Sequence, residues 1–201
     1  MKIRDSGMPA EQLWSTFFDP RATLTALGLI PESAVGDFGC GYGTFTIAAA
    51  QITRGPVYGV DIEPVMLATV RQKAASLAPT NVRAIQRDFM TDGTGLTIDF
   101  AMLFNILHTE NPLALLREAY RVLAAGGKIA VIHWNYDAGT PRGPSMDIRP
   151  RPEQCQMWMM QAGFTLVDPL IDLPPYHYGI VGQEIPIPLP LHLCVFALKF
   201  S

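Results

Sequence analysis

Cysteine is scarce in this sequence, and so is charge. The three cysteines stand far apart, at positions 40, 155 and 194, so no local pair can start a disulfide framework or a C-x-x-C metal site. Charged residues make up 16% of the 201 residues, and the net charge of −3 gives no general attraction for a polyanion. We therefore expect a cytoplasmic protein without a metal site, and we disfavour nucleic acid as a partner.

Long apolar runs are also lacking. The apolar stretch that begins at Ile180 is interrupted by Pro186, Pro188 and Pro190, so it falls short of the roughly 18 to 20 residues that a membrane helix needs. The start of the sequence carries two early basic residues with no apolar segment behind them, which does not fit a secretory signal. We therefore expect no membrane span.

Hydrophobic residues are abundant, at 49%, and short β-rich runs alternate with longer helical ones. This alternation predicts an α/β fold with βαβ crossovers and a parallel sheet covered by helices. The length suits a single domain over 1–201. The expected strands are 34–38, 57–61, 82–86, 98–104 and 128–134, and the expected helices are 43–53, 64–77, 112–124 and 152–162.

Three segments lie outside this alternating pattern. Residues 1–30 have apolar residues at roughly helical spacing and predict one or two helices that pack on the domain. Residues 137–152 are rich in Pro and Gly and contain arginines, so this candidate lid loop could clamp an acidic acceptor or could simply be solvated. The proline-rich, substrate-side connection 172–190 joins two more expected strands, 164–171 and 191–200, which we expect to be antiparallel neighbours.

A glycine-rich turn follows the first expected strand and leads into a helix. Its acidic, glycine and cysteine residues are Asp37, Gly39, Cys40, Gly41 and Gly43. Glycines allow positive φ angles and a close approach to a ligand, and the helix start offers N–H groups to an anion. The dinucleotide fingerprint is not met, because Thr44 stands where its third glycine should be. An acidic residue beside an anion-binding turn suits an amino-acid moiety, which carries both charges.

Two further strands lead into acidic residues. The strand 57–61 ends in Asp61, which could accept both hydroxyls of a ribose. The next strand is followed by Asp88 and Phe89, which could hydrogen-bond an adenine amino group and pack on its ring. Contacts to an amino acid, a ribose and an adenine describe one ligand lying across the carboxyl edge of the sheet. The competing interpretation is a set of structural turns, and it is strongest for Asp88.

Residues 34–134 resemble the class I S-adenosylmethionine-dependent methyltransferases, in particular the ubiquinone/menaquinone-methyltransferase-like (type 11) group. The resemblance includes F-N-I-L-H-T-E-N-P at 104–112 and R-V-L-A-A-G-G-K-I at 121–129. It implies a three-layer, Rossmann-like sheet of seven strands with the last strand antiparallel. It also implies S-adenosylmethionine as the cofactor and S-adenosylhomocysteine as the product.

The same resemblance implies a role for each motif. Asp37 and the glycine loop would hold the methionine part, and Asp61, with Ile62 beside it, would hold the ribose. Asp88 and Phe89 would hold the adenine. Residues 104–107, which begin with Phe104 and Asn105, would line the methyl-donor pocket. No N-P-P-Y follows the fourth strand, which argues against amide or base-nitrogen methylation, and the cysteines do not match the arsenic-methylating enzymes.

Two histidines are candidate proton acceptors. His108 follows the strand 98–104 and His133 lies near the end of the strand 128–134, so both fall at the same edge of the sheet. A histidine titrates near neutral pH, which suits proton removal, but each ring could instead satisfy a backbone group. Tyr176 and His177 could likewise contact substrate or only cover the edge of the core.

The sequence predicts methyl transfer to a small-molecule acceptor. A sulfonium donor is already activated, so the protein mainly has to align the donor with the acceptor. Quinone-like, phenolic and amine acceptors are all compatible with the sequence. A non-catalytic S-adenosylmethionine-binding sensor or assembly protein is the alternative, and a nicotinamide oxidoreductase is disfavoured by the missing glycine. The sequence indicates no particular oligomeric state.

Overall fold

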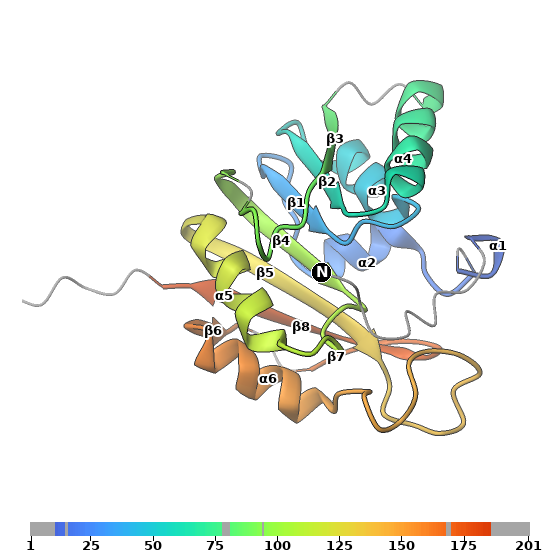
Figure 1. The fold of residues 1–201 in the computed structure, drawn as a ribbon, viewed down its shortest axis with the longest axis vertical. Helices are drawn as coiled ribbons and strands as arrows, with labels where there is room; N and C mark the ends of the chain where they lie inside the picture. Colours follow the sequence, from blue (N-terminus) through green and yellow to red (C-terminus); the bar gives the residue numbers. More distant parts are fainter. Residues whose placement is uncertain (1–10, 15, 78–80, 94, 168–169, 186–201) are drawn as a thin grey trace, which may run out of the picture.

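One mixed sheet organises the protein (Figure 1). The computed structural model describes residues 11–14, 16–77, 81–93, 95–167 and 170–185, and within them eight strands follow the order β3-β2-β1-β4-β5-β8-β6, with β7 also paired to β8. The strands are β1 (Val35–Phe38), β2 (Val57–Asp61), β3 (Val82–Gln86), β4 (Ile98–Phe104), β5 (Leu123–Trp134), β6 (Phe164–Leu166), β7 (Ile171–Leu173) and β8 (His177–Glu184). Pairing from β3 through β5 is parallel, whereas β8 is antiparallel to β5, β6 and β7.

The helices begin where the sequence offers start signals. They are α1 (Glu11–Trp14), α2 (Pro20–Ala26), α3 (Thr44–Ile52), α4 (Pro64–Leu77), α5 (Pro112–Val122) and α6 (Pro152–Gln161). Proline opens four of them because its missing N–H costs nothing in the first turn. Asn111 caps α5 by accepting a hydrogen bond of 3.0 Å from the N–H of Ala114. None of the helices in the described residues is both long and apolar enough to span a membrane.

Helices bury both faces of the sheet, which gives three layers (Figure 1). On one face, α5 and α6 pack through Leu115 and Met159 against apolar residues of β4, β5 and β8. On the other face, α2 and α3 pack through Leu24 and Phe45 against the alternate residues of the same strands. The predicted α/β, Rossmann-like fold is therefore confirmed, including the antiparallel last strand, but the described residues form eight strands and not the seven expected.

The last part of the chain departs from the prediction. Residues 177–184 form β8, whereas the sequence predicted a strandless connection over 172–190. The prolines flank this segment instead of interrupting it, and its first six residues are buried, so it pairs along β5 from Trp134↔His177 to Lys128↔Gln183. The strand expected over 191–200 lies outside the described residues. The expected strand 164–171 is divided between β6 and β7.

The strand β5 begins earlier than the predicted 128–134. Its residue Leu123 pairs with Ile98, yet the next pair joins Lys128 to Phe100, so residues 124–127 bulge out of the ladder. The predicted glycine turn therefore lies inside β5, where Gly126 has a φ of 78°.

Candidate functional site

The glycine loop between β1 and α3 has the backbone that its sequence predicts. Gly39, Gly41 and Gly43 have φ angles of 74°, 51° and 76°, in the left-handed region that disfavours side chains. A Cβ on Gly43 would lie 2.7 Å from Cγ2 of Val70, so space as well as backbone angle requires glycine there. The N–H groups of Gly39 and Cys40 donate to the carbonyl of Val60 at 2.8 and 3.2 Å. The loop therefore folds over the carboxyl end of β2.

Asp61 joins this loop to the end of β2. Its Oδ2 accepts a hydrogen bond of 2.9 Å from the N–H of Gly41, and its Oδ1 accepts one of 2.9 Å from the N–H of Glu63. Each carboxylate oxygen can accept a second hydrogen bond, so the side chain retains capacity for two hydroxyl donors. The neighbouring Ile62 presents its carbonyl to the amide of Gln86 at 3.3 Å.

Asp37 lies buried at the end of β1, only 3% exposed. The hydroxyl of Thr46, in the first turn of α3, donates to its Oδ2 at 2.5 Å. Burial raises the pKa of Asp37 to about 7; the Thr46 hydrogen bond opposes this rise, and the charge of Asp61 adds to it. A cation beside this carboxyl group would hold it ionised. Burial likewise raises the pKa of the Cys40 thiol, so it stays protonated at neutral pH.

Asp88 and Phe89 follow the end of β3. The N–H of Arg87 donates to the carbonyl of Asp61 at 3.0 Å, which keeps this segment beside β2. Asp88 accepts a hydrogen bond of 3.1 Å from the N–H of Met90, and the Phe89 ring packs 4.9 Å from the Phe38 ring. Phe89 is therefore part of the core. The structure brings Asp37, Asp61 and Asp88 to the ends of three neighbouring strands, β1, β2 and β3.

Asn105, at the end of β4, is unusual in two ways. Its φ of 57° is rare for a residue other than glycine, and such strain is concentrated at functional sites. Its side-chain nitrogen and oxygen are buried and have no hydrogen-bond partner within the described part of the chain. The other predicted donor-pocket residues, Phe104, Ile106 and Leu107, pack in the core. Asn105 therefore supplies the polar side chain of the segment 104–107.

His108 and His133 form a buried pair. Nδ1 of His108 lies 3.2 Å from Nε2 of His133, and Nδ1 of His133 accepts the N–H of Trp134 at 3.0 Å. Burial, together with the neighbouring His108, holds the pKa of His133 well below its usual range. A neutral His133 that accepts at Nδ1 carries its proton on Nε2, so it donates to Nδ1 of His108. The proton of a neutral His108 then sits on Nε2.

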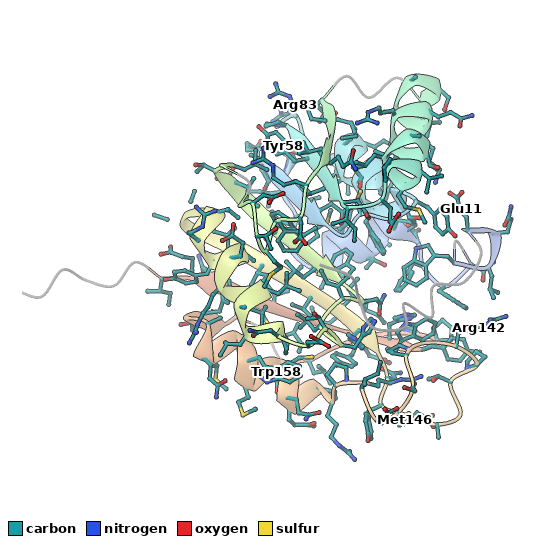
Figure 2. The ribbon with its side chains drawn as sticks, viewed as in Figure 1. Glu11, Tyr58, Arg83, Arg142, Met146 and Trp158 are labelled. Atoms are coloured by element: carbon teal, nitrogen blue, oxygen red, sulfur yellow. The ribbon has the colours of Figure 1, made fainter. Side chains whose placement is uncertain are left out.

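The arginines of the candidate lid loop do not act together. The buried guanidinium of Arg149 donates to the carbonyls of Asn135, Asp137, Arg142 and Pro144 at 2.8 to 3.2 Å and to the Thr140 hydroxyl. All of its N–H groups are thus used to hold the loop together. Figure 2 shows Arg142 at the outer edge of this loop, and Arg151 lies 3.9 Å over the Tyr136 ring. Arg149 is therefore an organiser of the loop, not the clamp considered from the sequence.

Two contributors to the site, Thr46 and Lys73, were not predicted from the sequence. Thr46 bonds Asp37, and its position in the first turn after the glycine loop could have indicated this. Lys73, on α4, donates to the carbonyl of Tyr42 at 2.8 Å and pairs with Glu11, and no local pattern marks it. His177 was noted only as a candidate substrate contact, and it lies at the centre of a group of aromatic rings.

Comparison with known proteins agrees with this geometry. Residues 35–127, which contain the glycine loop and all three acidic strand ends, match the methyltransferase domain family. This region is therefore similar to a methyltransferase domain, as the sequence motifs predicted.

Relatives of the methyltransferase domain occur among characterised and uncharacterised proteins. An uncharacterized 37.1 kDa protein in transposon TN4556 of Streptomyces fradiae is 32% identical over 62% of this chain and 37% of its own length. Demethylmenaquinone methyltransferase of a Geobacillus strain is 31% identical over 48% of this chain and 43% of its own length. The chain thus spans less than half the length of these relatives.

A solved structure shares the whole architecture. The S-adenosylmethionine-dependent methyltransferase from Aquifex aeolicus superposes with a TM-score of 0.76 at 22% identity, over 84% of this chain and 91% of that one. The likeness covers a larger part of the chain than residues 35–127.

Proposed function

We propose that this protein binds S-adenosylmethionine and transfers its methyl group to a small-molecule acceptor. The observation that carries the proposal is the cradle at the carboxyl ends of β1, β2 and β3. There Asp61 accepts a hydrogen bond of 2.9 Å from the N–H of Gly41, while Asp37 lies near the end of β1 and Asp88 follows β3. The match of residues 35–127 to the methyltransferase domain family supports the same function.

Each part of the cradle is assigned one part of the cofactor. The buried Asp37 takes the ammonium group, because a cation stabilises an anion that burial otherwise disfavours. The glycine loop and the start of α3 take the carboxylate. Asp61 accepts the ribose hydroxyls on its remaining lone pairs, and Asp88 lies against the adenine, whereas the neighbouring Phe89 ring packs in the core. When bound, the cofactor supplies an activated methyl group on a sulfonium.

The chain's own contribution to the reaction is mainly alignment. Fixing donor and acceptor in line can supply several kcal/mol, up to roughly 7 to 11 in well-aligned systems. The histidine pair is assigned a positioning role: His133 holds His108 in the tautomer whose Nε2 carries a proton, which makes His108 a hydrogen-bond donor. Neither ring then serves as the base, in contrast to the role considered from the sequence.

Substitution of the two histidines tests this assignment. His133→Asn should lower turnover and change its pH profile at saturating S-adenosylmethionine, because His108 loses its fixed tautomer. His108→Asn should lower turnover as well. Unchanged rates in both variants would remove the pair from the reaction.

The function itself is tested in two steps. Calorimetric titration should show saturable binding of S-adenosylhomocysteine and none of NAD. Incubation with methyl-labelled S-adenosylmethionine and fractionated cell extract, followed by mass spectrometry, should then reveal a labelled small molecule. Binding without any labelled product would favour the alternative, a sensor or assembly protein that binds the cofactor without catalysis.

A further inference from the structure

A second unsatisfied side chain lies at the same edge of the sheet as Asn105. His177 opens β8 directly opposite Trp134, the last residue of β5, and its side chain is fully buried at 0% exposure. Neither of its ring nitrogens has a hydrogen-bond partner among the residues that the structure describes. Buried polar groups nearly always find a partner, so an exception at the ligand edge of a sheet indicates a missing ligand.

The surroundings of His177 are aromatic. Its ring centre lies 4.2 Å from that of Trp134 and 4.5 Å from that of Phe18. The rings of Trp14 and Phe17 follow at 5.9 and 6.0 Å. These four rings, with His177, are called the aromatic cage below. Their faces are flat, apolar and uncharged, which suits a planar aromatic ligand.

The aromatic cage adjoins the place assigned to the methyl donor. Phe18 lies 5.3 Å from Phe45, and Phe45 lies 4.7 Å from Phe104, the residue before Asn105. Ring contacts therefore lead without a break from the end of β4 to His177. A ligand in the aromatic cage would lie beside the donor, not on a remote surface.

Residues 11–18 form the outer wall of the aromatic cage, and the structure describes all of them except residue 15. This segment contains α1, a single turn. Lys73 pairs with Glu11 at the start of this segment and also donates to the Tyr42 carbonyl in the glycine loop. The Glu11–Lys73 ion pair, the ring contacts and the burial of Trp14 and Phe17 in the core hold the segment in place, so a ligand that takes the place of Phe17 and Phe18 has to restore the apolar contacts that it displaces.

We propose that the aromatic cage is the acceptor site and that His177 recognises one neutral hydroxyl group on a planar aromatic acceptor, whose ring replaces Phe17 and Phe18 against His177. The proposal rests on the proposed methyl transfer and names its substrate class. A neutral imidazole has one N–H donor and one nitrogen acceptor, and a hydroxyl group both accepts and donates, so the two are complementary.

Charge argues for a neutral hydroxyl over a carboxylate. The guanidinium of Arg149 acts electrostatically on His177, but the N–H groups of Arg149 are held by its own loop. Burial keeps His177 neutral by lowering its pKa to about 3. A carboxylate in the aromatic cage would lose its hydration without gaining a hydrogen-bonded cationic partner, which is costly.

The test uses 2-naphthol and 2-naphthoate as probes, titrated by calorimetry into the protein saturated with S-adenosylhomocysteine. His177→Phe keeps a flat ring but removes both nitrogens, and His177→Gln keeps one donor and one acceptor. The expected result is saturable binding of 2-naphthol, at least tenfold weaker binding of 2-naphthoate, and at least tenfold weaker binding of 2-naphthol by His177→Phe. His177→Gln should recover most of the loss.

Three results would overturn the proposal: no saturable binding of 2-naphthol, binding by His177→Phe within threefold of wild type, or 2-naphthoate binding as tight as 2-naphthol. Should His177→Phe not fold, the wild-type protein still decides the question. Nitrogen chemical shifts of its histidine rings should move for one ring when 2-naphthol is added, and unmoved shifts would refute the role of His177. S-adenosylhomocysteine binding is measured separately, so a failure of the cofactor assignment is distinguishable from a failure of the aromatic cage.

Discussion

The affinity for S-adenosylhomocysteine should depend on pH through Asp37. Burial raises its pKa to about 7, and the ligand's ammonium group binds to the ionised form. With that pKa, about 90% of Asp37 is ionised at pH 8 and about 10% at pH 6, so the dissociation constant should rise about ninefold over this range. Binding at pH 6 should also release a proton from the protein.

Calorimetry at pH 6, 7 and 8, in buffers of different ionisation enthalpy, measures both effects. Asp37→Asn should bind more weakly at pH 8 and lose the pH dependence. Adenosine, which lacks the ammonium group, should bind the wild type equally at the three pH values. A ninefold change that persists in Asp37→Asn, or that adenosine shares, would refute the role of Asp37.

The same raised pKa has a consequence for stability. The folded protein binds a proton at Asp37 more tightly than the unfolded chain does, so between pH 4 and pH 7 the contribution of this group to stability falls as the pH rises. In urea unfolding of the ligand-free protein, the free energy of unfolding of Asp37→Asn should therefore increase relative to that of the wild type from pH 5 to pH 8. A constant difference over this range would contradict the raised pKa.

Three further predictions concern the cradle and its supports. Asp61→Ala should weaken S-adenosylhomocysteine binding at least tenfold by calorimetry, because it removes the acceptor of the Gly41 N–H and the assigned ribose contact. Gly43→Ala should lower the free energy of unfolding in urea by about 2 to 4 kcal/mol, because Gly43 has a φ of 76° and is crowded by α4. Gly95→Ala is the control: Gly95 has a φ of 63° but open space around it, so the loss should be only about 1 to 2 kcal/mol. Equal losses in the two variants would contradict the crowding at Gly43. Arg149→Met should lower the free energy of unfolding by about 3 kcal/mol in the same assay, because it leaves buried carbonyls without a hydrogen-bond donor. Arg142→Met, at an exposed position, should lower it by less than about 0.5 kcal/mol, and similar losses in the two variants would refute the organising role of Arg149.

The sequence predicted the central part of the fold well because each signal there is local. Strand ends such as Asp61 are followed at once by a helix start, and the loop glycines that need positive φ alternate with other residues within 39–43. Helix bounds agree within a few residues for the same reason. The parallel pairing followed from the α/β pattern, and the antiparallel last strand followed from the resemblance.

The C-terminal part was predicted less well because its strands depend on long-range pairing. His177–Glu184 carries no signal of its own between two groups of prolines, and it becomes a strand because β5 offers an open edge. The bounds of the short strands β6 and β7 are set by their pairing with β8, which no local pattern reveals.

Within the site, the sequence predicted the carboxylates at the strand ends but not the long-range contacts of the residues around them. Lys73 reaches the glycine loop from α4, and Trp134 meets His177 across two strands, so both contacts depend on the tertiary fold. The sequence left open whether Arg149 clamps an acceptor or is solvated, because only the folded loop shows that its guanidinium is buried.

The most direct test of the account is a crystal structure with S-adenosylhomocysteine. The account predicts one molecule across the ends of β1, β2 and β3, with the amino-acid part at Asp37 and Gly41, the ribose hydroxyls on Asp61, and the adenine beside Asp88. A ligand bound elsewhere on the protein, or a cradle left empty at saturating ligand, would contradict it.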